Sequence, residues 1–197
     1  IISISMPSSH DYIKDKRNKN IKIFINNKFY SRDKAKVSVF DSSVILGDGI
    51  WSGIRFHNNK FLFLKDHLDR LFDDAKKISL KIHLSKKQIS KILHDTININ
   101  KMKTDVHLRL VVSRGIKSTP YQDPAFTISK PTIIVIPEYK QPQDNIYKKG
   151  LVLKTVKTIR GPHNVQDPRI NSLSKLNCII ACIEAKKQKA DEALMFD

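Results

Sequence analysis

The sequence predicts a mixed fold, α+β or α/β, divided into two domains. Three observations predict it: short runs of β-branched and aromatic residues, two segments with apolar residues at helical spacing, and a polar, proline-containing stretch between two such groups. With 197 residues, 40% of them hydrophobic, the chain can form one large domain or two small ones. A chain of this length needs no disulfide framework or structural metal to fold.

The first domain is predicted over residues 21–138, after a loose lead-in of residues 1–20. Its strands are apolar runs bounded by turns, such as the Asn26-Asn27 turn of the first hairpin. Arg109 alternates with apolar neighbours, so its side chain is expected on the opposite face of its strand. The predicted strands are residues 21–25, 28–31, 49–57, 61–64, 106–112 and 132–137.

Two helices of this domain are predicted where the apolar period changes. The first carries Leu68, Leu71, Phe72, Ala75 and Ile78 on one side, and we expect Asp66 to be its N-cap. The second begins near Ser85 and carries apolar residues at positions 89, 92 and 93.

The second domain is predicted over residues 149–197, after a linker of residues 139–148. It opens with a strand over 150–158, a helix over 173–189 capped by Ser172 or Ser174, and a strand over 192–196. This series is too short to close a core alone. The chain starts at Ile1 although Met6 follows, and it ends in a strand that we expect to lack a partner. We therefore expect a portion of a longer protein.

The composition favours a cytoplasmic protein without a membrane or nucleic-acid partner. Cys178 and Cys182, at i and i+4 in an apolar run, indicate one helix face in a reducing compartment. The longest apolar runs are too short to span a bilayer. The net charge of +17 allows a nucleic-acid partner, but lysine outnumbers arginine 28 to 8 and is spread along the chain. A solvated basic surface is the favoured interpretation.

Three cations are candidates for binding or catalysis. Arg70 lies between two core leucines, and a guanidinium fork suits a phosphate; the alternative is a solvated helix arginine. Arg109 suits a carboxylate if its face of the sheet lines a cleft, and is otherwise solvated. Lys175 is expected in the first helical turn, where the macrodipole lowers the pKa of an amine nucleophile; the alternative is a surface lysine. No residues beside His67 have metal-ligand spacing, so no metal site is expected.

Several segments together resemble the class IV aminotransferases, the fold-type IV enzymes of pyridoxal 5'-phosphate (PLP). The strongest piece is Gly47-Asp48-Gly49-Ile50-Trp51-Ser52-Gly53-Ile54-Arg55, followed by a hairpin and His67-Leu68-Asp69-Arg70-Leu71. The resemblance continues in three further segments, which are residues 108–115, 176–185 and 190–194. The resemblance runs from about residue 21 to 197 and implies a two-domain fold-type IV enzyme whose second domain is incomplete here.

The resemblance implies roles for individual residues. Arg70 matches the arginine that holds the cofactor phosphate, Trp51 an aromatic residue of the substrate pocket, and Arg55 and Arg109 arginine positions near that pocket. The implied reaction moves an amino group between an amino acid and a 2-oxo acid, most like the branched-chain enzymes. The implied cofactor is PLP, and the full-length parent is expected to be a homodimer.

The implied catalytic lysine departs from the family pattern. Counted back from Glu184, it falls on Arg169, Ile170 or Asn171, and none of these can bind the cofactor aldehyde as an amine. Lys175, one helical turn later, is the substitute that we hypothesise. Two alternatives stay open: a PLP-dependent lyase similar to aminodeoxychorismate lyase, and a catalytically dead homologue with a binding role.

Overall fold

The computed structural model describes residues 14–141 and 144–196 and divides into two compact units. The sheet unit comprises Asp15–Lys140 and Ile170–Ser174, and the second unit includes, among the described residues, Lys14, Gln141 and residues 144–169 and 175–196. The domain borders expected from the sequence stay predictions, and residues 1–13 of the expected lead-in lie outside the described residues.

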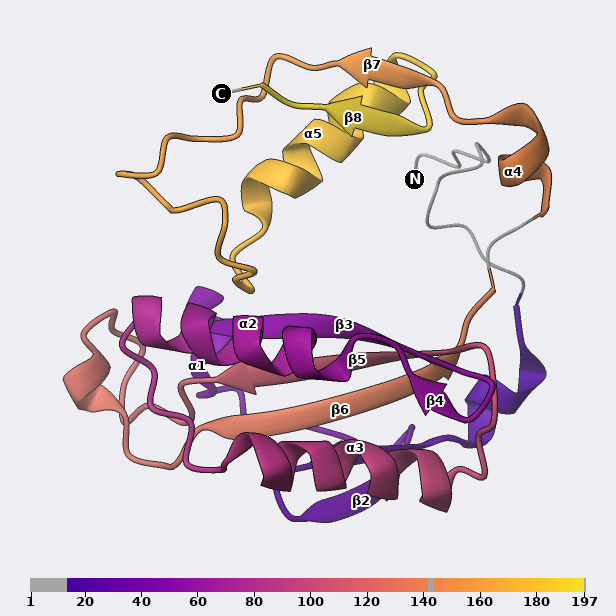
Figure 1. Cartoon of the computed structure of the whole chain (residues 1–197). Helices are drawn as coiled ribbons and strands as arrows, with labels where there is room; N and C mark the ends of the chain where they lie inside the picture. The colour runs from indigo at the N-terminus through magenta and orange to yellow at the C-terminus, as the bar shows by residue number, and fades with distance from the viewer. Residues whose placement is uncertain (1–13, 142–143, 197) are drawn as a thin grey trace. The chain divides into compact units, whose positions relative to one another are not determined.

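The sheet unit contains one antiparallel sheet of six strands (Figure 1). The predicted first hairpin is confirmed, with Asn26 in the left-handed region at φ 54° in its turn. The predicted strand over 61–64 is wrong beyond Phe61, because helix α2 already begins at Leu64. In the order β2-β1-β6-β5-β3-β4, the strands are β2 (Lys28–Ser31), β1 (Lys22–Ile25), β6 (Thr132–Tyr139), β5 (Val106–Ser113), β3 (Gly49–His57) and β4 (Lys60–Phe61).

Both predicted helices of the sheet unit are present, as α2 (Leu64–Lys77) and α3 (Lys86–Ile99). Ser85 begins α3 with a reciprocal capping box to Gln88. Asp66 as the N-cap of α2 is wrong: the cap is Phe63, at φ 52° and without a side-chain cap, and Asp66 lies in the first turn.

Three short helical elements of the sheet unit were not predicted. The helix α1 (Ser42–Leu46) starts where Asp41 accepts a hydrogen bond from Ser43 N, and it ends at Gly47 with φ 65°. The other two are the 3₁₀ helices Lys16–Asn20 and Pro124–Phe126. Each is too short to show a periodic apolar pattern.

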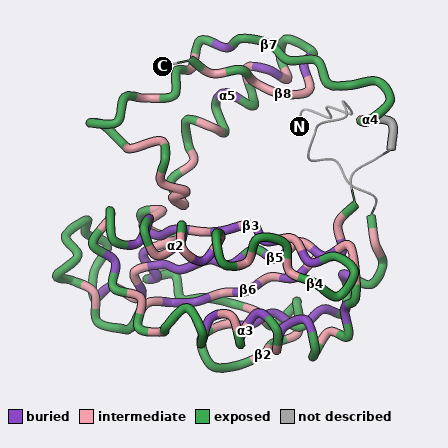
Figure 2. The backbone as a smooth tube through the Cα atoms, viewed as in Figure 1, coloured by how far each residue is buried: buried purple, intermediate pink, exposed green. Residues whose placement is uncertain are grey.

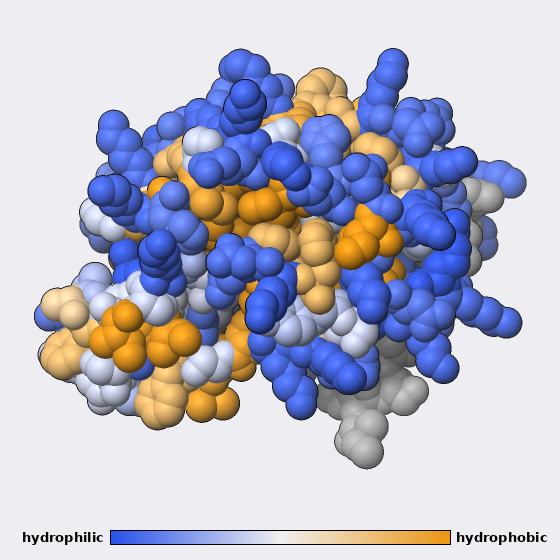
Figure 3. All heavy atoms as spheres, turned by 90° about the horizontal axis from the view of Figure 1, so that it is seen from below, coloured by the Kyte–Doolittle hydropathy of each residue, from blue (hydrophilic) through white to orange (hydrophobic). Residues whose placement is uncertain are grey.

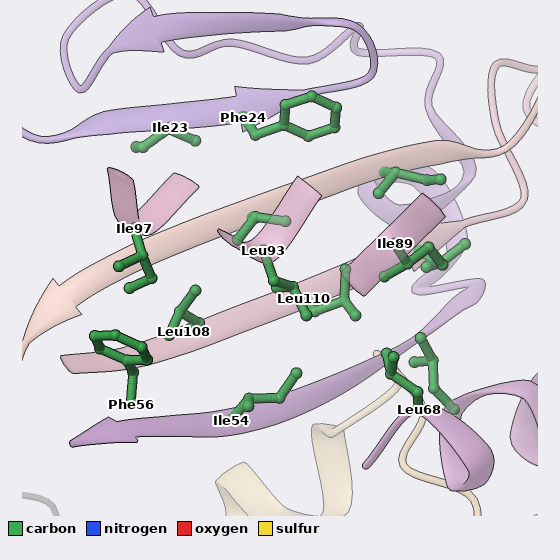
Figure 4. Close-up of a cluster of buried hydrophobic side chains, with 14 of the residues drawn as sticks. Ile23, Phe24, Ile54, Phe56, Leu68, Ile89, Leu93, Ile97, Leu108 and Leu110 are labelled. Atoms are coloured by element: carbon green, nitrogen blue, oxygen red, sulfur yellow. The ribbon is translucent and has the colours of Figure 1, made fainter. Parts of the chain in front are cut away.

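The helices α2 and α3 bury their apolar stripes against one face of the sheet. Ile54 of β3, Leu93 of α3 and Leu108 of β5 are all 0% exposed and lie in this core (Figure 4). Arg109 is exposed while both its neighbours are buried, so its predicted place on the opposite face is confirmed. The buried stretches follow the central strands and the inward side of α3 (Figure 2).

The second unit contains α4 (Asp144–Lys149), β7 (Leu153–Thr155), α5 (Leu176–Lys187) and β8 (Glu192–Leu194). The expectation that the last strand lacks a partner is wrong, because β8 pairs in parallel with β7. The expected strand over 150–158 is likewise shorter than predicted. Ser172 or Ser174 as the helix cap is also wrong, since α5 begins after Lys175 as its N-cap. Residues 142–143 of the expected linker lie outside the described residues.

One face of the molecule is mostly charged and polar. Hydrophilic atoms cover most of the face seen from below, and apolar atoms gather in a few places between them (Figure 3). Within the part of the chain that the structure describes, no helix combines the length and the apolar character that crossing a bilayer requires.

Candidate functional site

Strand β3 carries candidate residues on both of its faces. Successive side chains alternate, so Ser52 points toward the helices while Trp51 and Gly53 point to the open face. A Cβ on Gly53 would stand 2.7 Å from Nε2 of His107, so the imidazole would have to shift to admit a larger residue. The glycine of the sequence motif therefore leaves room for the imidazole on β5.

On the helix side, Ser52 joins His67 and Arg70 of α2. The Ser52 hydroxyl oxygen lies 3.2 Å from Nδ1 of His67 and accepts a hydrogen bond from Nη2 of Arg70 at 3.4 Å. Ser52 is 0% exposed, whereas Arg70 reaches solvent. Burial, followed by the charge of Arg70, lowers the pKa of His67 below its ordinary value. Apart from this bond, the guanidinium has no other hydrogen-bond partner among the described residues.

On the open face, Arg109 stacks on Trp51. Its guanidinium carbon lies 4.0 Å from the ring centroid, in cation–π contact. Packing removes part of the water around the guanidinium and lowers the pKa of Arg109, while the charge of Glu138 acts in the opposite direction. Arg109 stays charged and still reaches solvent. It can therefore attract a carboxylate while Trp51 supplies an apolar surface beside it.

Arg55 is already engaged within the sheet unit. It donates to the carbonyl of Lys140 at 2.5 Å and pairs with Asp105 at 3.4 Å. Asp105 also lies 3.0 Å from Nδ1 of His57. Arg55 is thus part of a polar cluster with Asp105 and His57. Its role in substrate binding stays a prediction.

The segment Ile170–Ser174 lies along the first half of β3 and forms an isolated antiparallel bridge there, between Ser172 and Ile50. Trp51 N donates to the carbonyl of Asn171 at 3.0 Å, and the Asn171 side-chain amide donates to the carbonyl of Trp51 at 3.0 Å. Leu173 N donates to the carbonyl of Gly49 at 2.9 Å. A Cβ on Gly49 would stand 2.7 Å from Leu173 Cδ1, so this close approach also depends on a glycine.

Asp74 of α2 anchors the same segment and was missed by sequence reasoning. Its carboxylate is 2% exposed and accepts a hydrogen bond from Asn171 N at 3.2 Å. The sequence signal was weak: an aspartate beside the apolar stripe of a helix, adjacent to Ala75. Only the fold brings it to a residue nearly a hundred positions later.

The motif around Asp48 is held by a bidentate ion pair. Nε and Nη2 of Arg114 bind the two carboxylate oxygens of Asp48 at 2.6 and 3.0 Å. The same guanidinium donates to the carbonyls of Ile78 and Ser79. Arg114 thus ties the start of β3 to the end of α2, which shapes the loop from which Trp51 and Ser52 follow.

The position expected for the catalytic lysine contains Asn171, whose amide is bound to Trp51. None of residues 169–174 is a lysine. Lys175 follows directly and belongs to the second unit as the N-cap of α5, so its predicted place inside the first helical turn is wrong. The catalytic role of Lys175 stays a prediction, as do the roles of Arg70, Trp51 and Arg109.

Residues 49–197 match the family described as amino-transferase class IV. The chain belongs to the class IV aminotransferases. The match includes β3, α2, β5 and α5, which are the elements that carry the candidate residues.

Two relatives in this family are named for different substrates. The chain is 37% identical over 177 residues to a Methanocaldococcus jannaschii protein whose name places it among the branched-chain-amino-acid aminotransferases. It is 26% identical over 175 residues to a D-alanine aminotransferase of Staphylococcus aureus. These alignments include 90% and 88% of this chain but 60% and 59% of those proteins. The chain thus spans about 60% of the length of these relatives.

Solved structures confirm the fold-type IV architecture. The branched-chain aminotransferase of Thermoproteus uzoniensis with norvaline superposes with a TM-score of 0.75 at 25% identity, over 89% of this chain and 59% of that one. The branched-chain amino acid aminotransferase of Escherichia coli gives a TM-score of 0.76 at 17% identity, over 91% of this chain and 59% of that one.

Proposed function

We propose that this chain is part of a PLP-dependent class IV aminotransferase that moves an amino group between an amino acid and a 2-oxo acid. The observation that carries the proposal is Arg70: an exposed arginine inside the matched family region, whose guanidinium donates to a buried hydroxyl and has no other hydrogen-bond partner among the described residues. The names of the relatives favour branched-chain amino acids first and D-alanine second.

The donor set at Arg70 fits the phosphate end of PLP. A guanidinium has five N–H donors, and Arg70 uses one of them on Ser52, so a fork remains for two phosphate oxygens. The aldehyde end of PLP requires an amine. Because residues 169–174 contain none, we assign this role to Lys175.

The remaining roles follow from charge and position. Bound PLP would supply the electron sink for chemistry at the amino acid Cα. Arg109 would bind a substrate carboxylate, and Trp51 would cover its apolar part. Lys175 Nζ would move the proton at that Cα. We further propose that the full-length parent is a cytoplasmic homodimer.

A second candidate function is cofactor binding without transamination. The anchored amide of Asn171 favours it, because this side chain occupies the edge of β3 next to Trp51 and cannot act as a nucleophile. Lys175 comes four residues after Asn171 in the chain. Each extended residue advances the chain by about 3.3 Å, so four residues separate the two positions by up to ~13 Å.

Reduction with borohydride distinguishes the two candidates. The protein is mixed with PLP, reduced and digested, and the modified peptide is identified by mass spectrometry. Stoichiometric modification of Lys175, lost in Lys175→Ala and kept in the control Lys157→Ala, supports the aminotransferase. A modification at a different lysine refutes the assignment of Lys175. Binding without any specific modification supports the second candidate.

A further inference from the structure

Arg70 is the cation on which the proposed phosphate site depends, yet it lies on an exposed helix face. A long side chain in that position samples many rotamers unless a neighbour restrains it, and restraint before binding improves affinity. Among the described residues, only Ser52 supplies a hydrogen bond to the guanidinium. The environment of Ser52 therefore decides how Arg70 is oriented.

Hydrogen-bond accounting at Ser52 leaves one arrangement that satisfies every group. Arg70 can only donate, so the Ser52 oxygen must accept from it. The Ser52 hydroxyl proton then needs an acceptor, and Nδ1 of His67 at 3.2 Å is in place. If Nδ1 carried a proton, it would donate to the same oxygen, and a hydroxyl that is 0% exposed would have no acceptor.

We infer that Ser52 and His67 are positioning residues for Arg70. His67 is the neutral tautomer with its proton on Nε2, its Nδ1 accepts the Ser52 proton, and the Ser52 oxygen holds Nη2 of Arg70. Two of the four remaining N–H groups of the guanidinium can then form the fork toward an anionic phosphate. This inference rests on the proposed role of Arg70 and adds the two residues that orient it.

The charges around the imidazole agree with this arrangement. Arg70 and burial both disfavour a second proton on His67, while Asp66 favours one. Burial and the charge of Arg70 together outweigh Asp66, because the net effect is a lowered pKa of His67. Removal of Arg70 is therefore expected to raise the pKa of His67, and so is a bound phosphate, because its negative charge offsets the guanidinium.

The first experiment reads the tautomer without any ligand. In ¹⁵N NMR of the 197-residue chain at pH 7.5, Nδ1 of His67 is expected at the position of an unprotonated ring nitrogen and Nε2 at that of a protonated one. Arg70→Ala is expected to raise the pKa of His67. A proton on Nδ1, or an unchanged pKa in Arg70→Ala, would overturn the inference.

The second experiment titrates inorganic phosphate into the same chain and its variants. A single hydrogen bond corresponds to about a fivefold change in affinity, so Ser52→Ala is expected to weaken phosphate binding about fivefold. His67→Phe should do the same, His67→Asn should keep most of the affinity through its amide acceptor, and the control Ser90→Ala should change nothing. Because the two residues act as one unit, Ser52→Ala/His67→Phe should be no weaker than either single variant.

The outcomes separate this inference from the proposed function. If Arg70→Ala abolishes phosphate binding while Ser52→Ala and His67→Phe bind as well as the unmodified chain, the positioning role is wrong and the phosphate site stands. If Arg70→Ala binds phosphate as well as the unmodified chain, or if the unmodified chain binds none, the proposed phosphate site itself is wrong.

Discussion

The sheet unit and the second unit differ in how much apolar surface they bury. In the sheet unit, large side chains such as Leu93 and Leu108 are 0% exposed between two helices and a six-stranded sheet. The buried core of the second unit contains Val156 and three alanines, and α5 leaves Leu176 68% and Ile179 54% exposed. Because burial of large apolar groups dominates folding free energy, most stability of the described chain is expected to reside in the sheet unit.

The same contrast separates the candidate residues. Arg70, Trp51 and Arg109 lie on helices and strands of the sheet unit, and Asn171 is bound to the edge of β3. Lys175 begins a helix that is apolar on most sides and is packed on a small core. The proposed binding groups thus belong to the well-packed unit, and the proposed amine belongs to the other.

The largest expected effect tests the packing contrast directly. Leu93→Ala removes a fully buried side chain from the sheet-unit core and should lower the free energy of unfolding by ~3–4 kcal/mol. Leu176→Ala, on the exposed side of α5, should change it by less than about 0.5 kcal/mol. Urea unfolding followed by tryptophan fluorescence measures both, and equal losses would break the comparison.

The next largest loss of stability is expected from alanine substitution at a tightly packed glycine, compared with a glycine in open space. A Cβ on Gly49 would stand 2.7 Å from the carbonyl oxygen of Val112 and 2.9 Å from Ser113 Cα, so Gly49→Ala should cost ~1–3 kcal/mol of stability. Gly150 has open space around it but φ 73°, so Gly150→Ala should cost about 1 kcal/mol from backbone strain alone. Thermal unfolding measures both, and a larger loss at Gly150 would contradict the packing argument.

A smaller effect is expected for hydrogen bonds from a backbone N–H to an aspartate carboxylate, of which each unit contains an example. Asp74→Ala removes the buried acceptor of Asn171 N and should cost ~1–2 kcal/mol and speed amide exchange at Asn171. Asp74→Asn, which keeps a carbonyl acceptor, should cost less. Asp191→Ala removes the acceptor of Val152 N, bound at 2.8 Å in an exposed setting, and should cost about 0.5 kcal/mol or less. Equal exchange rates at Asn171 in all three variants would show that Asp74 does not hold the segment.

The smallest effect is expected in the titration of Glu184 in the second unit. The hydroxyl of Thr158 donates to Glu184 and Lys157 N adds a second bond, which together lower the pKa of Glu184 below its ordinary value of 4.5. A carboxyl with a lowered folded-state pKa stabilises the fold above its unfolded pKa, and this contribution is lost as the pH falls through the folded-state pKa. The Lys157 amide signal should therefore shift with a midpoint below pH 4.5.

Two comparisons sharpen this titration. Thr158→Val should move the midpoint upward, because the main cause of the shift is removed. Asp69 of the sheet unit, bound to Lys65 and Lys86, should titrate near its pKa of about 2. An unchanged midpoint in Thr158→Val would show that the hydroxyl does not stabilise the carboxylate.

Much of the sheet unit was predictable because its signals are local. Alternation in residues 106–112 placed Arg109 opposite Leu108, and the apolar stripe of α2 predicted the helix that carries Arg70. Predictions of caps failed where backbone geometry overrode side-chain preference. Phe63 begins α2 in a left-handed conformation that no local pattern signals, and Asp66 therefore lies inside the helix.

The sequence by itself determined the family, the residue types available for binding and the absence of a lysine at 169–174, because these depend only on residue identity and spacing. The tertiary structure decided which groups meet. It brought Asp74 and Trp51 to Asn171, and Arg109 onto Trp51. It also engaged Arg55 with Asp105 and joined Ser52 to His67 and Arg70. The physical reason is that hydrogen bonds and cation–π contacts act over a few ångströms, and only sheet register and helix packing bring residues far apart in the chain within that distance.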